Sequence, residues 1–229
     1  MGLWRAVRSL AWKRRNNSMK DIKVVVFDCD GVLFNTDRAN RAYYNAVLRR
    51  LGKPEITAEQ FAFVHMHAVA VSMRYLFPDD LEHQAAERFR RQMDYRPFVQ
   101  EMEMEPGLIP LLSRLRPRYK TAIATNRTDT MDTVIKAHGL TDYFDLVICA
   151  RDVVNPKPHP EPLQKILTYF HTDPRQTVYV GDSDVDARTA EGAGVFFVAY
   201  KNAALSADYH LNRMEDLEAI LNGTPMHTD

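Results

Sequence analysis

The sequence predicts an α/β fold: a doubly wound, mostly parallel, Rossmann-like sheet with an inserted helical cap domain. Three observations support this prediction. Short apolar runs recur with helical stretches between them, these runs are continuous rather than alternating, and one long interval has no strand pattern. Continuous runs of β-branched and aromatic residues indicate strands buried on both faces, as in a parallel sheet. Alternation of strands and helices is typical of doubly wound α/β proteins.

Five apolar runs of strand length define the expected sheet, and the first of them, KVVVFD, is the most hydrophobic. The expected strands are 23–28, 121–125, 145–149, 177–180 and 195–200. Amphipathic stretches between them are expected to form crossover helices, because their apolar residues recur at helical spacing. These stretches are 108–115, 131–138 and 162–170. The second stretch ends at Gly139, a residue type that commonly follows the last turn of a helix.

The interval between the first and second expected strands is about ninety residues long, far longer than a strand–helix–strand crossover needs. It reads instead as several helices. An apolar stripe predicts a helix over 39–51, and Thr57 with Gln60 three residues later forms a capping-box pattern. A third helix is expected over about 79–93, with an aspartate at its start. We therefore expect a helical insert directly after the first strand.

The expected domain organisation is a basic N-terminal tail over 1–18, an α/β core over 19–35 and 106–229, and a helical cap over 36–105. The first twenty residues hold six basic residues and no acidic one, beside apolar residues at roughly helical spacing. Such a segment is either a membrane-surface anchor or targeting peptide, or a tail without fixed structure. We favour the tail, since Met19 just before the first strand offers an alternative start.

The bulk composition excludes several classes of protein. With 229 residues, 45% of them hydrophobic, the chain can bury a sizeable core. Thirty basic residues balance thirty acidic ones, so no overall field attracts nucleic acid or an anionic membrane. No apolar run reaches about 18 residues, and two cysteines are too few for a disulfide framework. We expect a cytoplasmic protein with no nucleic-acid partner and no stable membrane association; nothing indicates its oligomeric state.

Two acids follow the most hydrophobic strand. Asp28 and Asp30 flank Cys29 and are followed by Gly31, which permits a tight turn. Open α/β sheets bind ligands beyond the carboxyl ends of their strands. Side chains two residues apart on a strand point to the same side, about 6–7 Å apart. One carboxylate could then attack phosphorus while the other handles a proton; the alternative is two acids that merely end a strand at a turn.

Polar residues also follow the next three expected strands. Thr125 and Asn126 end the second strand, Lys157 lies a few residues beyond the third, and Asp182 and Asp186 follow the fourth. Each has an ordinary interpretation: a helix cap for the threonine, a solvated loop for the lysine, and a favourable helix start for the two acids. Their coincidence at one edge of the sheet is better explained by a common site.

The four segments resemble the four motifs of the haloacid dehalogenase superfamily, in the same order. They are DCDGV at 28–32, the threonine at 125, NPKPHPEP at 155–162 and GDSDVD at 181–186. The resemblance extends from Lys23 to about Val198, most of the chain. The chain is similar to the subgroup with a helical cap after the first motif, which includes phosphoglycolate phosphatase and β-phosphoglucomutase.

This resemblance implies a magnesium site and a proton shuttle. Asp28 would be the nucleophile and a Mg²⁺ ligand. Asp30 would protonate the leaving oxygen, then activate water, and its backbone carbonyl would also bind the metal. Asp182 would complete the metal ligands. Magnesium prefers hard oxygen ligands and keeps several waters, which suits two carboxylates and a carbonyl.

The resemblance also implies how the phosphoryl group is held. Thr125 and Asn126 would bind its oxygens, and Lys157 would bind substrate and neutralise charge beside the nucleophile. Asp186 would orient metal-bound waters or the lysine. A carboxylate that approaches a phosphate is repelled unless cations intervene, which Mg²⁺ and the lysine would supply.

We therefore expect a Mg²⁺-dependent phosphatase that hydrolyses a small organic phosphomonoester, such as phosphoglycolate, through an aspartyl-phosphate intermediate. The alternatives are a phosphosugar mutase of the β-phosphoglucomutase type and a non-catalytic binding protein on the same scaffold. A dehalogenase is disfavoured, because such members lack the second acid that Asp30 supplies. On a helix, His65 and His67 would lie about 200° apart and could not share a metal ion. We expect them to serve in packing or at the surface; the alternative is that a loop of the cap places one of them over the substrate.

Overall fold

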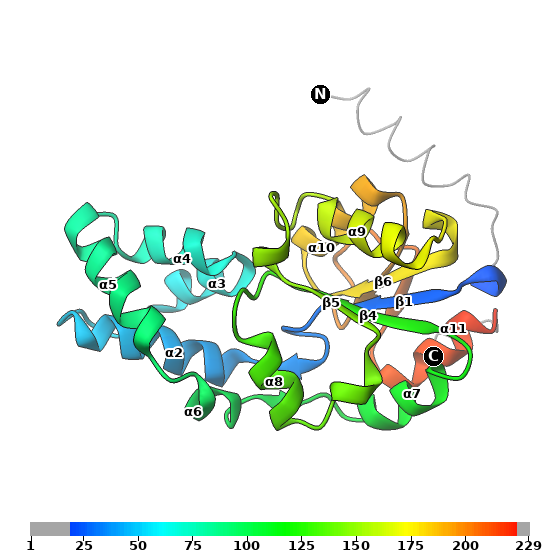
Figure 1. Ribbon diagram of the computed structural model, residues 1–229, viewed down its shortest axis with the longest axis horizontal. Helices are drawn as coiled ribbons and strands as arrows, with labels where there is room; N and C mark the ends of the chain where they lie inside the picture. Colours follow the sequence, from blue (N-terminus) through cyan, green and yellow to red (C-terminus); the bar gives the residue numbers. More distant parts are fainter. Residues whose placement is uncertain (1–18, 224–229) are drawn as a thin grey trace.

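The computed structural model describes residues 19–223, and the predicted basic tail lies outside them. A six-stranded sheet forms the centre of the molecule, with helices on both faces and a separate group of helices at one end (Figure 1). The strand order is β5-β4-β1-β6-β7-β8, and every neighbouring pair is parallel. The strands are β1 (Val24–Phe27), β4 (Lys120–Ala124), β5 (Leu146–Ile148), β6 (Thr177–Gly181), β7 (Phe196–Tyr200) and β8 (Tyr209–Leu211). The predicted fold class is confirmed.

The central strand β1 shows why the sheet is covered on both faces. Val25 and Phe27 pack into one apolar cluster, and Val24 and Val26 into another on the opposite face. Alternate residues of a strand point to opposite faces, and both faces of this sheet are covered, so all four side chains are buried. Helices α7 (Leu108–Leu115), α8 (Met131–Ala137) and α11 (Leu217–Leu221) cover the first face, and α9 (Glu161–Phe170) and α10 (Asp184–Ala193) cover the second (Figure 1).

Five further helices, α2 to α6, form the region that we call the helical region. They are α2 (Asp37–Arg50), α3 (Ala58–Met66), α4 (Val69–Leu76), α5 (Asp80–Gln92) and α6 (Arg96–Val99). This region has an apolar core of its own, which includes the fully buried Phe77 and Met73. The predicted capping box at Thr57 is present, since its side chain accepts from Gln60 N–H and the glutamine side chain accepts in return. The third predicted helix, with an aspartate at its start, is α5. Asp79 is its N-cap, and the aspartate side chain accepts from the N–H groups of Leu81 and Glu82.

Short elements were not recognised from the sequence. They include the edge strand β8, the helices α4 and α6, and the pair β2 (Phe34–Asn35) and β3 (Glu103–Met104). The last two strands pair antiparallel where the chain leaves the sheet and returns to it. With two to four residues each, β2, β3, β8 and α6 are too short to show a periodic pattern. The 3₁₀ turns are η1 (Met19–Asp21), η2 (Thr141–Tyr143), η3 (Ala150–Asp152), η4 (Pro174–Gln176) and η5 (Met214–Asp216).

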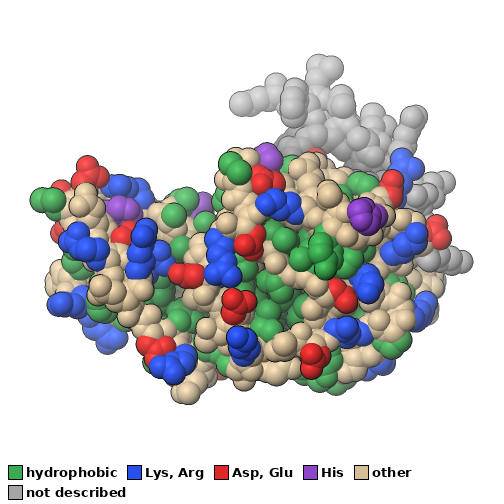
Figure 2. Space-filling model, viewed as in Figure 1, with side chains coloured by type: hydrophobic (Ala, Val, Ile, Leu, Met, Phe, Trp, Pro, Cys, Tyr) green, Lys and Arg blue, Asp and Glu red, His purple; other side chains and the backbone are tan. Residues whose placement is uncertain are grey.

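The described surface carries both signs of charge. On the face shown in Figure 2, Lys and Arg side chains are interspersed with Asp and Glu, and neither sign dominates. Within residues 19–223, no helix combines the length and apolar character that a membrane span requires.

Candidate active site

A cavity of about 110 Å³ lies where the carboxyl ends of β1, β4 and β6 face the helical region. This space is large enough for one compact ligand. All but one of the residues predicted from the sequence line it, and the exception, Asp186, lies directly behind it. The predicted residues that line it are Asp28, Asp30, Thr125, Asn126, Lys157 and Asp182. The structure therefore brings together side chains that are up to 154 positions apart in the sequence (28 to 182).

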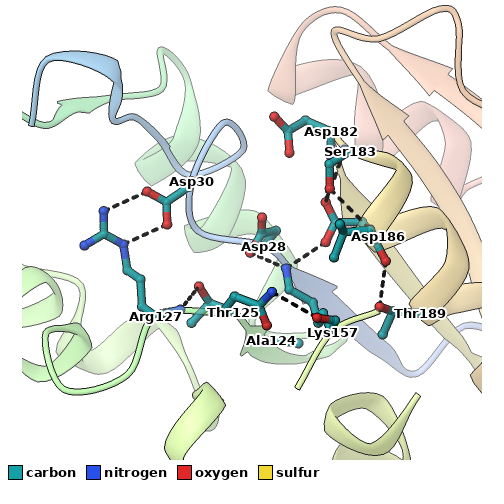
Figure 3. Close-up of polar contacts among 12 residues, drawn as sticks. Asp28, Asp30, Ala124, Thr125, Arg127, Lys157, Asp182, Ser183, Asp186 and Thr189 are labelled. Carbon is teal, nitrogen blue, oxygen red and sulfur yellow. Dashed lines mark hydrogen bonds and ion pairs between the residues drawn. The ribbon is translucent and has the colours of Figure 1, made fainter. Parts of the chain in front are cut away.

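Asp28 follows β1 directly and is 6% exposed. Its backbone N–H donates to the carbonyl of Val180 in β6 at 2.9 Å, which continues the sheet pairing and fixes the residue. Its carboxylate forms an ion pair with Lys157 Nζ at 2.8 Å (Figure 3). Burial raises the pKa of Asp28 well above its usual range, although the lysine charge opposes this. A cation near this carboxylate favours the ionised form that a nucleophile needs.

Lys157 is buried between two carboxylates. Its Nζ lies 2.8 Å from Asp28 Oδ1 and 2.7 Å from Asp186 Oδ1, and its side chain is 3% exposed. Burial acts to lower the pKa of Lys157, but the charges of Asp186 and Asp28 outweigh burial and raise it above its usual range. The ammonium group is therefore charged, and it holds a positive charge beside the proposed nucleophile.

The buried Asp186 accepts hydrogen bonds at both of its carboxylate oxygens. Its Oδ1 accepts from Lys157 Nζ and from the hydroxyl of Tyr179, both at 2.7 Å. Its Oδ2 accepts from Ser183 Oγ at 2.5 Å and from the backbone N–H groups of Ser183 and Asp182 at 3.2 and 3.3 Å. Ser183 in turn caps α10. Both carboxylate oxygens are thus occupied by donors, which favours a positioning role over direct metal ligation.

Three acids, Asp28, Asp182 and Asp186, offer oxygen atoms within 4.8 Å of one another. Since donors already occupy Asp186, the other two carboxylates are the pair best suited to a cation. Burial, with the charge of Asp186, raises the pKa of Asp182 to about 7. A side chain at Gly31 would place its Cβ 2.0 Å from Asp182 Oδ2, so the glycine keeps room for this carboxylate. Two close, hard oxygen donors fit Mg²⁺.

Asp30 points away from Asp28 and toward Arg127 (Figure 3). Arg127 donates from Nε to Asp30 Oδ2 at 2.8 Å and from Nη2 to Asp30 Oδ1 at 2.7 Å. Burial acts to raise the pKa of Asp30, but the guanidinium charge and its hydrogen bonds outweigh burial and hold this pKa well below the usual range. In this arrangement Asp30 is an ionised carboxylate. Sequence reasoning missed Arg127, although a basic residue two positions after Thr125 was a readable signal.

Thr125 and Asn126 follow β4. The Thr125 N–H donates to the carbonyl of Ile148 in β5 at 3.0 Å, and its hydroxyl accepts from the Arg127 N–H at 3.2 Å. Asn126 Nδ2 donates to the backbone carbonyl of Lys157 at 3.1 Å. The asparagine therefore ties the loop after β4 to the loop that carries the lysine.

The helical region supplies the other wall of the cavity. Its lining residues were not assigned to the site from the sequence. They are Asn40, Tyr43, Tyr44, Val64, His65, Met66, His67, Val69, Arg90 and Tyr95. His65 and His67 both line the cavity, and both also pack against aromatic rings, His65 on Phe61 and His67 on Phe63. His65 Nδ1 lies 3.3 Å from Asn40 Nδ2, whereas His67 Nδ1 lies 2.7 Å from the Phe63 carbonyl. The two imidazoles therefore have separate partners.

Comparison with known families agrees with this geometry. A family model described as haloacid dehalogenase-like hydrolase matches residues 25–200. The chain therefore belongs to the haloacid dehalogenase-like hydrolases. A solved subfamily IA hydrolase of this superfamily from Geobacter sulfurreducens is 38% identical, with a TM-score of 0.74, and the match covers 90% of this chain and 99% of that one.

The chain also matches two curated relatives over most of its own length and most of theirs. Phosphoglycolate phosphatase from Rhodobacter capsulatus is 31% identical over 86% of this chain and 94% of its own length. Pyrophosphatase PpaX from Bacillus pumilus is 29% identical over 87% of this chain and 96% of its own. β-Phosphoglucomutase from Clostridium difficile, at 18% identity and a TM-score of 0.76, shares the fold.

Proposed function

We propose that this protein is a Mg²⁺-dependent phosphatase that hydrolyses a small organic phosphomonoester, with Asp28 as the nucleophile. The observation that carries the proposal is a buried carboxylate at the end of β1, 2.8 Å from a buried ammonium group and beside a second carboxylate suited to a cation. Phosphoryl transfer requires positioning and charge stabilisation more than elaborate bond-making by the protein.

The reaction has two displacement steps. In the first, an Asp28 oxygen attacks phosphorus and the bond between phosphorus and the leaving oxygen breaks. Asp30, which takes up a proton from solvent after it leaves Arg127, gives that proton to the leaving oxygen. In the second, Asp30 takes a proton from water as the water attacks phosphorus, the bond to Asp28 breaks, and inorganic phosphate leaves. A covalent intermediate divides one difficult step into two easier ones.

The remaining residues hold charge and position. When bound, Mg²⁺ would supply positive charge at the transferring phosphoryl oxygens, and Asp28, Asp182 and the backbone carbonyl of Asp30 would hold it. Thr125 and the backbone of Asn126 would donate to the phosphoryl oxygens. Lys157 would reduce repulsion between the phosphate and the attacking carboxylate. Asp186 would hold the lysine in place.

The relatives support a compact, highly charged substrate. One is named a phosphoglycolate phosphatase and another a pyrophosphatase, so phosphoglycolate is our first candidate and inorganic pyrophosphate the second. Both molecules carry a second anionic group close to the phosphorus. The helical region, which we propose acts as a cap over 36–105, would select among substrates, because its side chains form the cavity wall opposite Asp28.

Two other functions have weaker support. The likeness to β-phosphoglucomutase concerns the fold alone, so it does not favour a mutase. A non-catalytic binding protein would have little reason to keep Asp28, Lys157 and Asp186 buried together, since buried charges without a function cost stability.

The test is phosphate release from a panel of small phosphoesters and pyrophosphate, with and without Mg²⁺. We expect metal-dependent turnover by the unsubstituted protein and a loss of at least about a thousandfold in Asp28→Asn. Asp142→Asn, at an exposed carboxylate of η2, is the control and should retain full activity. Unchanged turnover in Asp28→Asn would contradict the assigned role. Interconversion of sugar phosphates with little phosphate release would instead identify a mutase.

A further inference from the structure

Arg127 has every one of its guanidinium donors engaged. Beside the two hydrogen bonds to Asp30, Nη1 donates to Tyr95 OH at 2.6 Å and to Thr130 Oγ1 at 3.3 Å. Nη2 also donates to Asn40 Oδ1 at 3.4 Å. A guanidinium group has five N–H donors, so none is left over. Of these partners, three are neutral and Asp30 alone is anionic.

The guanidinium group is also buried. The Arg127 side chain is 8% exposed and the Asp30 side chain 18%. The Arg127 group lies over the Tyr95 ring, with Cζ 5.7 Å from the ring centroid. A buried charge that loses its partner is costly, because water cannot replace the lost interaction. Arg127 therefore needs an anion in each state of the reaction.

The proposed function requires Asp30 to leave this partner. Asp30 has to reach the leaving oxygen of a phosphoryl group held beside Asp28, yet Figure 3 shows its carboxylate turned toward Arg127. When Asp30 turns toward the substrate, two aligned N–H groups of a buried guanidinium become available. Such a pair matches the geometry of a carboxylate or phosphate group.

The other cations of the cavity wall are not in this position. Lys157 keeps Asp28 and Asp186 as partners. Arg90 is paired with Glu87 at 3.0 Å, within the helical region. Among the described residues that line the cavity, Arg127 is the Lys or Arg whose single anion within hydrogen-bond distance, Asp30, is required by the reaction to turn away.

We propose that Arg127 binds a second anionic group of the substrate, a carboxylate or a second phosphoryl group, in exchange for Asp30. This inference rests on the proposed function. Arg127 lies two residues from Thr125, in the same cavity of about 110 Å³, so the second group lies only a few bonds from the phosphorus. Substrates with that group release Asp30 for catalysis, and substrates without it leave Asp30 on the arginine.

The test compares two substrates that differ in one group: phosphoglycolate and 2-hydroxyethyl phosphate, in which a hydroxymethyl group replaces the carboxylate. With Mg²⁺, we expect kcat/KM to be at least about a hundredfold higher for phosphoglycolate. Arg127→Met should reduce this ratio to below about tenfold, chiefly through loss of phosphoglycolate turnover. Pyrophosphate as a third substrate distinguishes a phosphoryl group from a carboxylate as the preferred second anion.

Arg127→Met also leaves Asp30 unpaired, so a second variant guards against misfolding. Arg127→Lys keeps the charge but loses the paired donors, and we expect it to lower the ratio about tenfold. The control is Arg114→Gln, at an exposed residue of α7 paired with Glu218, which should leave the ratio unchanged. The same ratio in Arg127→Lys and the unsubstituted protein overturns the inference. Absence of turnover on all three substrates and the wider panel would instead reject the proposed function.

Discussion

Asp186→Asn is the substitution that most directly tests whether the buried Asp186 carboxylate stabilises the site. Asp186 is fully buried, and its two oxygens accept from five donors. An amide keeps the size of the side chain but replaces one oxygen with an NH₂ group. Whichever way it turns, that group faces donors: Lys157 and Tyr179 on one side, or Ser183 and the backbone N–H of Asp182 on the other.

The loss follows from these contacts. Hydrogen bonds to charged groups contribute about 1.5–3 kcal/mol each, and at least two are lost. Lys157 also loses one of its two counter-charges, and breaking a buried ion pair costs about 3–5 kcal/mol. The two estimates describe the same contacts, so we expect the free energy of unfolding to fall by about 4 kcal/mol. For a chain of this size that lowers Tm by about 10 °C.

The assay is thermal unfolding followed by far-UV circular dichroism. The control is Asp184→Asn, at an exposed residue in the first turn of the same helix, where the carboxylate pairs with Arg188 at 2.9 Å. Exposed pairs contribute little, so this variant should lie within about 0.5 kcal/mol of the unsubstituted protein. A Tm for Asp186→Asn within about 2 °C of the unsubstituted protein would refute the reasoning.

Three further predictions concern the metal and the helical region. Gly31→Ala should weaken Mg²⁺ binding at least tenfold by calorimetry, because its Cβ would meet Asp182, whereas Gly52→Ala, with a similar positive φ and open space, should leave binding unchanged. The pKa of Asp182, about 7, lies above the unfolded value of about 3.9, so the stability it contributes is present below about pH 4 and lost as pH rises through 7. Mg²⁺ displaces that proton, so calorimetry should show about tenfold weaker binding at pH 6 than at pH 8. Thr57→Ala should lower the unfolding free energy by about 1 kcal/mol through loss of the capping box, measured as a lower Tm.

Much of the α/β core could be predicted because its signals are local. The run at β1 is continuously apolar since the strand is buried on both faces, and the polar residues after each strand meet because parallel strands end at one edge. The capping box at Thr57 was readable for the same reason, since the two residues that form it lie three positions apart.

The rest depends on contacts that the sequence does not encode locally. Arg127 and Asp30 are 97 positions apart, and their pairing requires β1 and β4 to lie side by side. The wall that His65 and Arg90 contribute depends on how the helical region packs against the sheet. No periodic pattern within a helix specifies that packing, so these residues could be identified only from the structure.

The central claim is that Asp28 accepts the phosphoryl group, and trapping the covalent intermediate tests it most directly. The protein would be mixed with Mg²⁺ and phosphoglycolate, quenched in acid during turnover, and reduced with borohydride, which converts an aspartyl phosphate to homoserine. We predict homoserine at position 28, found by peptide mass spectrometry, and none without substrate. Unmodified aspartate at position 28, from a sample that is releasing phosphate, would contradict the account.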